Sequence, residues 1–503
     1  MERDHQQGNE PRLHRAKADP VVMEEKAARR KRFSRKNKLH APVIHNTEFT
    51  VISSLFVILF VAVGAYLIHF MLYEGDYYRN NAYNPRLGAA EARVTRGEIL
   101  SADGKVLAGN KGDSRTYPFG EVYAHVVGYN SNGKSGVELQ ENETLLKSHV
   151  SPVRRLQNLF AGQKDQGDNV TLTVDSQIQQ AAYNAIGSHR GAAVVLDPET
   201  GRILAMVSKP DFDPNRVEEN WKALSTDTDR AALVNRANQG LYPPGSVFKI
   251  VTSLSYLRQN QGSDSNFSYD CKGTFSKDGY TIHCFDNERH GQENLMQAFG
   301  NSCNTAFANV GLSLNYEQWK KTSQDMLFGE GLPTDLANSA TSKFQLAKND
   351  GSAAIMQTAI GQGNTLVTPL HMAMLVSAVA NDGKLMQAHI KDKVTSADGF
   401  TVYSSNRSQA GQLMTSAEAD LLKSYMRYVV TNGTARSINS RNYDIYGKTG
   451  TAEYNSDKDS HSWFVGFAQK DGKKVALAVI LEGAGGTSAS ATSAAGKIFK
   501  ACY

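Results

Sequence analysis

This sequence contains little cysteine, and beyond its first 48 residues it carries no net charge. Four cysteines in 503 residues are too few for a scaffold held by disulfides. Residues 1–48 contain 12 Lys and Arg against 7 Asp and Glu, whereas the remainder contains 43 residues of each sign. A neutral main body lacks the basic surface on which nucleic-acid-binding proteins depend, so we expect no nucleic acid among the partners.

One long hydrophobic run stands out against this background. Residues 49–73 carry no formal charge and are mostly apolar, which suits the roughly 20 residues that a helix needs to cross a bilayer. Basic residues precede the run, whereas Glu74 and Asp76 follow it, so the positive-inside rule predicts a cytoplasmic N-terminus. A cleaved signal peptide is the alternative, but 48 residues precede the run and no small-residue cleavage site follows it. We therefore expect a basic cytoplasmic tail (1–48) and a single-pass membrane anchor (49–73).

The extracytoplasmic part divides into two regions. Residues 74–167 are irregular and rich in turn signals, which predicts a small, mostly extended pedestal module. From residue 168 the pattern is regular, with hairpin signals near each end of the region and helical stretches between them. Strands at both ends favour an α+β domain whose antiparallel sheet is built from both chain ends and flanked by helices. The expected hairpins join 192–196 to 203–207 and 463–467 to 475–481, and the expected helices follow Asp175, Thr368 and Thr415.

The first chemical motif is a serine followed three residues later by a lysine. Ser246 and Lys249 stand where a turn ending at Gly245 leads into an apolar helical pattern, so the spacing places both side chains on one helix face. A serine hydroxyl becomes a good nucleophile when an adjacent base takes its proton, and a desolvated lysine can be that base. The helix start also offers backbone donors for an oxyanion. Alone the pair is weak evidence, because Ser131 and Lys134 have the same spacing.

Two further motifs follow in the chain. Ser302-Cys303-Asn304 lies between two helical-looking stretches, where a loop can direct a hydroxyl and an amide into a cleft. Lys448-Thr449-Gly450-Thr451 follows an extended stretch. There a cation and hydroxyls could hold a substrate carboxylate, and the glycine permits close approach of the backbone.

Together, and in this order, the three motifs resemble the active-site signature of the penicillin-binding proteins and serine β-lactamases. The resemblance covers about residues 75–490, and it is strongest to the class B, monofunctional penicillin-binding proteins of the penicillin-binding protein A branch. It also rests on residues 93–104, Gly136-Val137-Glu138, residues 284–291, Gly361-Gln362-Gly363 with Thr368-Pro369, and Trp463-Phe464-Val465-Gly466.

The resemblance implies a peptidoglycan D,D-transpeptidase that β-lactams inhibit. It implies that Ser246 is acylated by a D-Ala-D-Ala stem peptide, with Lys249 as its base. By position, the resemblance implies that Ser302 relays protons and that Asn304 binds the peptide. It implies that Lys448, Thr449 and Thr451 secure the terminal carboxylate and the proton relay, with Gly450 in the same substrate-binding segment, and that the Ser246 and Thr451 N–H groups form the oxyanion hole. It also implies that a multi-spanning glycosyltransferase of the shape, elongation, division and sporulation family supplies the glycan strands.

Other functions and sites receive less support from the sequence. A membrane-anchored β-lactam sensor or a β-lactamase is the alternative, but residues 1–48 hold no effector domain and a β-lactamase would need no anchor. Cys271 and Cys284 could form a disulfide or stay free. His290 and His461 have no partner at metal-ligand spacing, so we expect neither a metal nor another cofactor.

Overall fold

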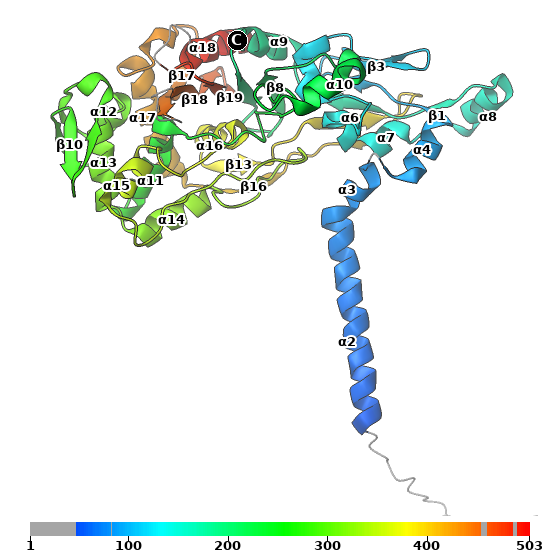
Figure 1. The fold of residues 1–503 in the computed structure, drawn as a ribbon, viewed down its shortest axis with the longest axis horizontal. Helices are drawn as coiled ribbons and strands as arrows, with labels where there is room; N and C mark the ends of the chain where they lie inside the picture. Colours follow the sequence, from blue (N-terminus) through cyan, green and yellow to red (C-terminus); the bar gives the residue numbers. More distant parts are fainter. Residues whose placement is uncertain (1–46, 82, 454–459, 486–489) are drawn as a thin grey trace, which may run out of the picture. The chain divides into compact units, whose positions relative to one another are not determined.

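The computed structural model describes residues 47–503 except residue 82, residues 454–459 and residues 486–489 (Figure 1). It divides into two compact units, residues 1–74 and residues 75–503. The described part of the first unit is helix α2 (Thr47–His69), which continues as a π-helical turn at Phe70–Glu74. The helix is long and apolar enough to cross a membrane, with a mean hydropathy of 2.6 over its most apolar window. The apolar run expected to be an anchor is therefore helical.

The second unit begins with a module built on a six-stranded sheet. The strand order is β15-β14-β6-β2-β3-β4, in which β2 and β6 are parallel and the other neighbours antiparallel. Because β14 and β15 lie far downstream in the chain, the sheet extends across the boundary predicted at residue 168, which stays a prediction. The sequence predicts a mostly extended module, whereas in the structure the helices α3 to α8 contain more of residues 75–167 than the short strands β1 to β5 do. The elements are α3 (Gly75–Asn80), α4 (Pro85–Glu91), β1 (Val94–Thr95), β2 (Ile99–Leu100), β3 (Val106–Lys111), β4 (Ser114–Thr116), α5 (Ala124–Val127), α6 (Gly136–Gln140), α7 (Asn142–Leu146), α8 (Pro152–Ala161), β5 (Asp165–Gln166), β6 (Asn169–Leu172), β14 (Lys391–Thr395) and β15 (Thr401–Ser404).

A buried ion cluster joins the strands and helices of this module. The carboxylate of Glu138 accepts hydrogen bonds from Arg96 Nε at 2.6 Å and from Arg115 Nε at 2.7 Å. Burial alone would raise the pKa of Glu138, but the two guanidinium groups outweigh burial and lower that pKa. Arg96 and Glu138 come from two of the stretches on which the family resemblance rests, and the cluster explains why an arginine and a glutamate stand there.

A five-stranded antiparallel sheet forms the core of the remaining chain. Its order is β17-β18-β19-β7-β8, so the two predicted hairpins meet where β19 pairs with β7. The α+β class and the sheet built from both ends of the domain are therefore confirmed. The strands are β7 (Gly191–Leu196), β8 (Ile203–Lys209), β17 (Asp444–Glu453), β18 (Ser460–Lys470) and β19 (Lys473–Leu481).

Helices cover both faces of this sheet (Figure 1). All 12 residues of α16 are buried, and the helix packs on β19, β18 and β7. On the other face, α9 and α18 pack against each other and against β8 and β19. The predicted caps are present, since Asp175 begins α9 and Thr368, followed by Pro369, begins α16. These helices are α9 (Ser176–Ile186), α16 (Pro369–Ala380) and α18 (Ala491–Cys502).

A second group of elements surrounds the first helix after the Ser246 motif. This helix, α11 (Lys249–Gln259), is buried along most of its length and contacts α13, α14 and α17. The remaining elements are α10 (Val217–Thr226), β9 (Tyr269–Cys271), β10 (Thr274–Lys277), β11 (Tyr280–His283), β12 (Gly291–Glu293), α12 (Leu295–Gly300), α13 (Asn304–Ser313), α14 (Tyr316–Asp325), α15 (Ser352–Ala359), β13 (Lys384–Met386), β16 (Gln409–Gln412) and α17 (Ser416–Thr431).

Candidate active site

Ser246 lies in a tight turn that precedes α11. The sequence predicts a helix that starts at about Ser246, and the structure begins it with a single 3₁₀ turn, Gly245–Phe248, labelled η4. Side chains three residues apart eclipse one another in a 3₁₀ helix, so this turn sets Lys249 beside Ser246 on one face. Gly245 has a φ of +54°, and a Cβ there would lie 2.4 Å from Thr451 O. Only glycine therefore lets the nucleophile turn lie this close to strand β17.

Lys249 is completely buried at the start of α11. Its Nζ donates to Ser302 O at 2.6 Å and to Asn304 Oδ1 at 2.8 Å, and it lies 3.3 Å from Ser302 Oγ. Burial lowers the pKa of Lys249 to about 8. A substantial fraction of this lysine is therefore neutral near physiological pH, as a general base requires.

Ser302 connects α12 to α13 in a left-handed backbone conformation. Its φ is +57°, a region that a serine adopts at a cost of about 1 kcal/mol. The turn is held from both sides, because Cys303 N donates to Ala298 O at 2.9 Å and Cys303 caps α13. As the sequence predicts, this loop between two helices directs a hydroxyl and an amide toward Lys249. Asn304 Nδ2 donates to His283 O at 3.0 Å, which fixes the orientation of the amide.

The third motif lies inside β17, the edge strand of the five-stranded sheet. Lys448 is completely buried, and its Nζ donates to Ser302 Oγ at 2.9 Å and to Thr449 O at 3.0 Å. Burial and then the charge on Lys249 lower the pKa of Lys448 well below its ordinary value. The family resemblance gives Lys448 a part in holding the substrate carboxylate and in the proton relay, and its contact with the Ser302 hydroxyl fits the second of these.

The other residues of the third motif face the nucleophile turn or the surface. A Cβ at Gly450 would lie 3.0 Å from Val247 Cγ1, so the missing side chain allows β17 to pack against η4. Thr449 Oγ1 shares a 2.6 Å hydrogen bond with Thr434 Oγ1, and Thr451 is exposed. Thr434 is a contact that the sequence analysis missed, because nothing in its local pattern links it to β17.

A cavity of about 470 Å³ opens beside these residues. Its lining includes Pro243, His283, Asn304, Gln362 and Glu453, so it lies between the nucleophile turn, the Ser302–Asn304 loop and the end of β17. It has the position and size of a cleft for an extended peptide.

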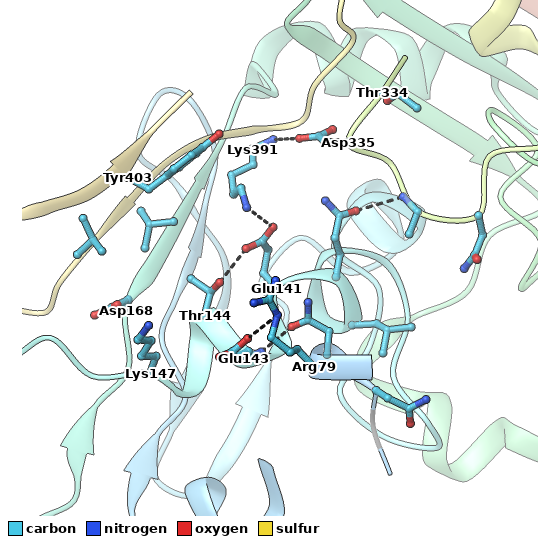
Figure 2. Close-up of a pocket in the computed structure, with 18 of the residues that line it drawn as sticks. Arg79, Glu141, Glu143, Thr144, Lys147, Asp168, Thr334, Asp335, Lys391 and Tyr403 are labelled. Carbon is cyan, nitrogen blue, oxygen red and sulfur yellow. Dashed lines mark hydrogen bonds and ion pairs between the residues drawn. The ribbon is translucent and has the colours of Figure 1, made fainter. Parts of the chain in front are cut away.

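A cavity of about 870 Å³ lies elsewhere (Figure 2). It lies between helices α3, α6 and α7, strands β14 and β15, and residues 334–338, and ion pairs join charged residues of its lining. Lys391 Nζ lies 2.8 Å from Glu141 Oε1, and Arg79 Nε lies 3.6 Å from Glu143 Oε2. None of the three motifs lines it, so we assign the chemistry to the smaller cleft.

The structure shows the state of Cys271 and Cys284 and the surroundings of the two histidines, His290 and His461. Cys271 and Cys284 are free thiols whose sulfur atoms are 3.7 Å apart. His290 has no partner at metal-ligand spacing in the sequence, but in the structure its Nδ1 lies 3.3 Å from Cys271 Sγ, and the fold brings Cys284 and Cys303 to the same place. Sequence spacing could not show this, because the four residues approach each other through the pairing of β9 with β12 and the packing of α13 on β9 and β11. His461 lies apart from them, against the ring of Tyr242.

Comparison with known proteins agrees with this geometry. Residues 191–503 match the penicillin binding protein transpeptidase domain, and residues 96–170 match the penicillin binding protein A dimerisation domain. The chain belongs to the penicillin-binding protein transpeptidase family. The chain is 31% identical to the peptidoglycan D,D-transpeptidase PbpA of Mycolicibacterium smegmatis, over 90% of this chain and 96% of that one.

Solved structures of the family have the same fold. The penicillin-binding protein A of Mycobacterium tuberculosis, solved as an imipenem acyl-enzyme complex, superimposes with a TM-score of 0.74 at 28% identity, covering 82% of this chain and 99% of that one. The D,D-transpeptidase domain of a peptidoglycan glycosyltransferase from Eggerthella lenta gives 0.73 at 30% identity, covering 82% and 98%. The predicted family, fold class and enzyme class are therefore confirmed: the protein is a serine-type D,D-transpeptidase.

Proposed function

We propose that this D,D-transpeptidase of peptidoglycan uses Ser246 to attack a D-Ala-D-Ala stem peptide and transfers the acyl group to an amine of a neighbouring strand. The observation that carries the assignment is the buried Lys249, which follows Ser246 by one 3₁₀ turn and contacts both Ser302 and Asn304. Neutral Lys249 takes the Ser246 proton as Oγ attacks the carbonyl carbon. The peptide bond then breaks, and the terminal D-alanine leaves with a proton on its amine.

Ser302 relays that proton. Its hydroxyl lies between two buried amines, 3.3 Å from Lys249 Nζ and 2.9 Å from Lys448 Nζ. Two ammonium groups this close repel each other in a buried site, and burial lowers the pKa of both. The pair therefore shares protons through Ser302, which can protonate the leaving amine and later deprotonate the attacking one.

Strand β17 offers a place for the donor peptide. An edge strand presents unpaired backbone groups, and an extended peptide can add to it as a further strand. Thr449 and Thr451 then lie within the strand that the peptide would follow, where their hydroxyls can bind its terminal carboxylate. The N–H groups of Ser246 and Thr451 are proposed to stabilise the oxyanion, since Gly245 and Gly450 let the two segments approach closely.

Mapping of a β-lactam adduct tests the nucleophile. After incubation with penicillin and proteolysis, mass spectrometry should place the adduct on the peptide that contains Ser246. Ser246→Ala should form no adduct and should melt within a few degrees of the wild type, because the side chain is small and only partly buried. An adduct on any other peptide would overturn the assignment. Rapid hydrolysis of the adduct would favour a β-lactamase.

We also propose the membrane arrangement that the charge pattern favours, with residues 1–48 in the cytoplasm and the catalytic domain outside. A cysteine introduced into the tail of the full chain tests it. Such a cysteine should react with a membrane-impermeant maleimide only after cell lysis. Labelling of intact cells would contradict the proposed orientation.

The proposed partner is a multi-spanning glycosyltransferase of the shape, elongation, division and sporulation family. A module that binds a membrane partner needs an apolar surface, and α8 exposes Val153, Leu156, Leu159 and Phe160. We propose that this face of α8 contacts the glycosyltransferase. The contact would hold the acylating cleft near the emerging strands and so raise their effective concentration.

Two altered forms of this protein test whether it binds the glycosyltransferase. A chain beginning at residue 75 should bind fluorescent penicillin but should fail to replace the full-length protein in cells, even when exported. Leu159→Glu with Phe160→Glu in the full chain should keep acylation and lose crosslinking to the glycosyltransferase. Full replacement by the exported, soluble chain would refute the proposal. If the chain beginning at residue 75 binds lipid vesicles and loses that binding when it carries the same two substitutions, α8 binds lipid instead.

A further inference from the structure

Four buried side chains gather around Cys303, the middle residue of the Ser302–Asn304 loop. Their ligand atoms, three sulfurs and one imidazole nitrogen, all lie within 4.8 Å of one another. Cys284 Sγ is 3.7 Å from Cys271 Sγ and 3.8 Å from Cys303 Sγ, and His290 Nδ1 is 3.3 Å from Cys271 Sγ. They come from the end of β9, the residue after β11, the residue before β12 and the cap of α13.

These separations fit a tetrahedral metal site. Zinc binds thiolate sulfur at about 2.3 Å, which places two sulfurs of a tetrahedron about 3.8 Å apart. Both sulfur–sulfur distances agree with this value, and both are far longer than the bond of about 2.05 Å in a disulfide. Soft thiolates together with one imidazole are a ligand set that selects Zn²⁺, and four protein ligands make a closed, structural site.

The groups around the cluster suit a bound cation. Thr305 is fully buried, and its Oγ1 lies 3.2 Å from Cys271 Sγ and 3.4 Å from Cys303 Sγ, where a hydroxyl can donate to a thiolate. Behind the imidazole, Glu288 Oε2 lies 3.6 Å from His290 Nε2. A carboxylate in this position orients a metal-binding histidine with its other nitrogen toward the ion.

We propose that Cys271, Cys284, His290 and Cys303 bind one zinc ion, which holds the Ser302–Asn304 loop in its active conformation. Binding would release three thiol protons to solvent and form three Zn–S bonds and one Zn–N bond. The ion would restrain a loop whose serine has a φ of +57° and whose carbonyl accepts a hydrogen bond from Lys249. Metal binding stands independently of the proposed function, whereas its effect on acylation rests on that function.

A disulfide is the competing state of the same cysteines. It would use only two of the three thiols and would leave the third thiol and the imidazole buried together without a joint role. A zinc ion uses all four groups at once. The two states also differ in the number of titratable thiols, which makes them distinguishable in the intact protein.

Metal analysis of the full chain, purified in detergent without chelators, tests the site. We expect about one zinc ion per chain by mass spectrometry of metals, and release of the same amount when a mercurial reagent titrates the thiols. Replacement by Co²⁺ should give the visible absorption of a tetrahedral thiolate complex. The proposal is overturned if the reduced protein takes up neither metal, or if peptide mapping finds a disulfide among these cysteines.

Variants of the ligands provide the matched comparison. Cys284→Ser and His290→Ala should lower zinc affinity by about tenfold or more, whereas His290→Cys should retain zinc because it keeps four ligands. Cys502→Ser is the control, since Cys502 is also a buried, free cysteine but lies outside the cluster. Equal zinc content in Cys284→Ser and Cys502→Ser would refute the assigned ligands. If the ligand variants fail to fold, the cobalt spectrum of the wild type still decides.

The positioning role has a separate readout. Removing zinc from the wild type should slow acylation of Ser246 at saturating penicillin, and restoring zinc should recover the rate. Penicillin affinity should change less than the acylation rate, because the loop acts on the reacting groups. If zinc binds but has no effect on acylation, the metal site is supported, and its role in positioning the Ser302–Asn304 loop is refuted. Failure of the holoprotein to acylate Ser246 at all would instead count against the proposed function.

Discussion

Two regions of this protein bury positive charge, and they do it in opposite ways. In the module, Arg96 and Arg115 surround the carboxylate of Glu138, so opposite charges compensate each other and the pKa of Glu138 is lowered. In the active site, Lys249 and Lys448 are completely buried, and among the described residues their hydrogen-bond acceptors are carbonyl, amide and hydroxyl oxygens. Neutral acceptors do not compensate the desolvation of an ammonium group, so both lysine pKa values fall.

The comparison shows that this fold places a stabilising ion cluster and a proton-transferring pair of lysines in different regions. The compensated Glu138 cluster keeps its charges and stabilises the contact between its strands and helices. The lysine pair lacks such compensation, so it loses protons more easily and can transfer them. Each region can be disturbed without the other, because they lie in different parts of the second unit.

Lys249→Arg should have the largest effect. The guanidinium keeps the positive charge but cannot accept the Ser246 proton, so acylation should slow by about a thousandfold or more. Time courses of labelling with fluorescent penicillin measure this rate, and the variant's melting temperature shows whether it is folded. Acylation at nearly the wild-type rate would remove Lys249 from the role of base.

Arg96→Met should have the next largest effect, on stability alone. It leaves Glu138 buried with one guanidinium partner, which should lower the free energy of unfolding by about 3 kcal/mol. Urea denaturation measures the loss. The acylation rate of the folded fraction should stay unchanged, and a parallel fall in that rate would show that the two regions are coupled.

Lys448→Arg should slow acylation by about tenfold, less than the change at Lys249. A guanidinium can still donate to Ser302 Oγ, but it is too large for a completely buried site and does not release its proton. The same labelling assay shows which of the two lysine variants slows acylation more. A greater loss at Lys448 than at Lys249 would exchange the proposed roles of the two lysines.

The pH dependence of acylation should show the smallest effect. Because burial lowers the pKa of Lys249 to about 8, its neutral fraction grows as the pH rises toward that value. The rate should increase about fivefold from pH 7 to pH 8 and then level off. The Glu138 cluster responds at lower pH: its folded pKa is lowered, so its contribution to stability is present above the unfolded value of 4.5 and is lost as the pH falls further. A rate that is flat between pH 6 and pH 9 would contradict the first expectation.

Much of the fold follows from local pattern. The hairpins β7-β8 and β18-β19 and the capped helices α9, α16 and α17 lie where turn residues and apolar spacing predict them. The module was harder to predict, because its sheet takes β14 and β15 from residues 391–404, and such long-range pairing leaves no local signal.

The same division holds at the active site. Sequence alone predicted which residues carry the chemistry and determined the family to which the chain belongs, because the three motifs are recognisable by residue type, spacing and order. Only the tertiary structure decided what those residues do to one another. Burial lowers the lysine pKa values, the left-handed Ser302 brings its hydroxyl between two amines, and strand pairing gathers three cysteines and a histidine into one cluster. Desolvation and proximity are properties of the packed chain, so no local pattern of residues contains them.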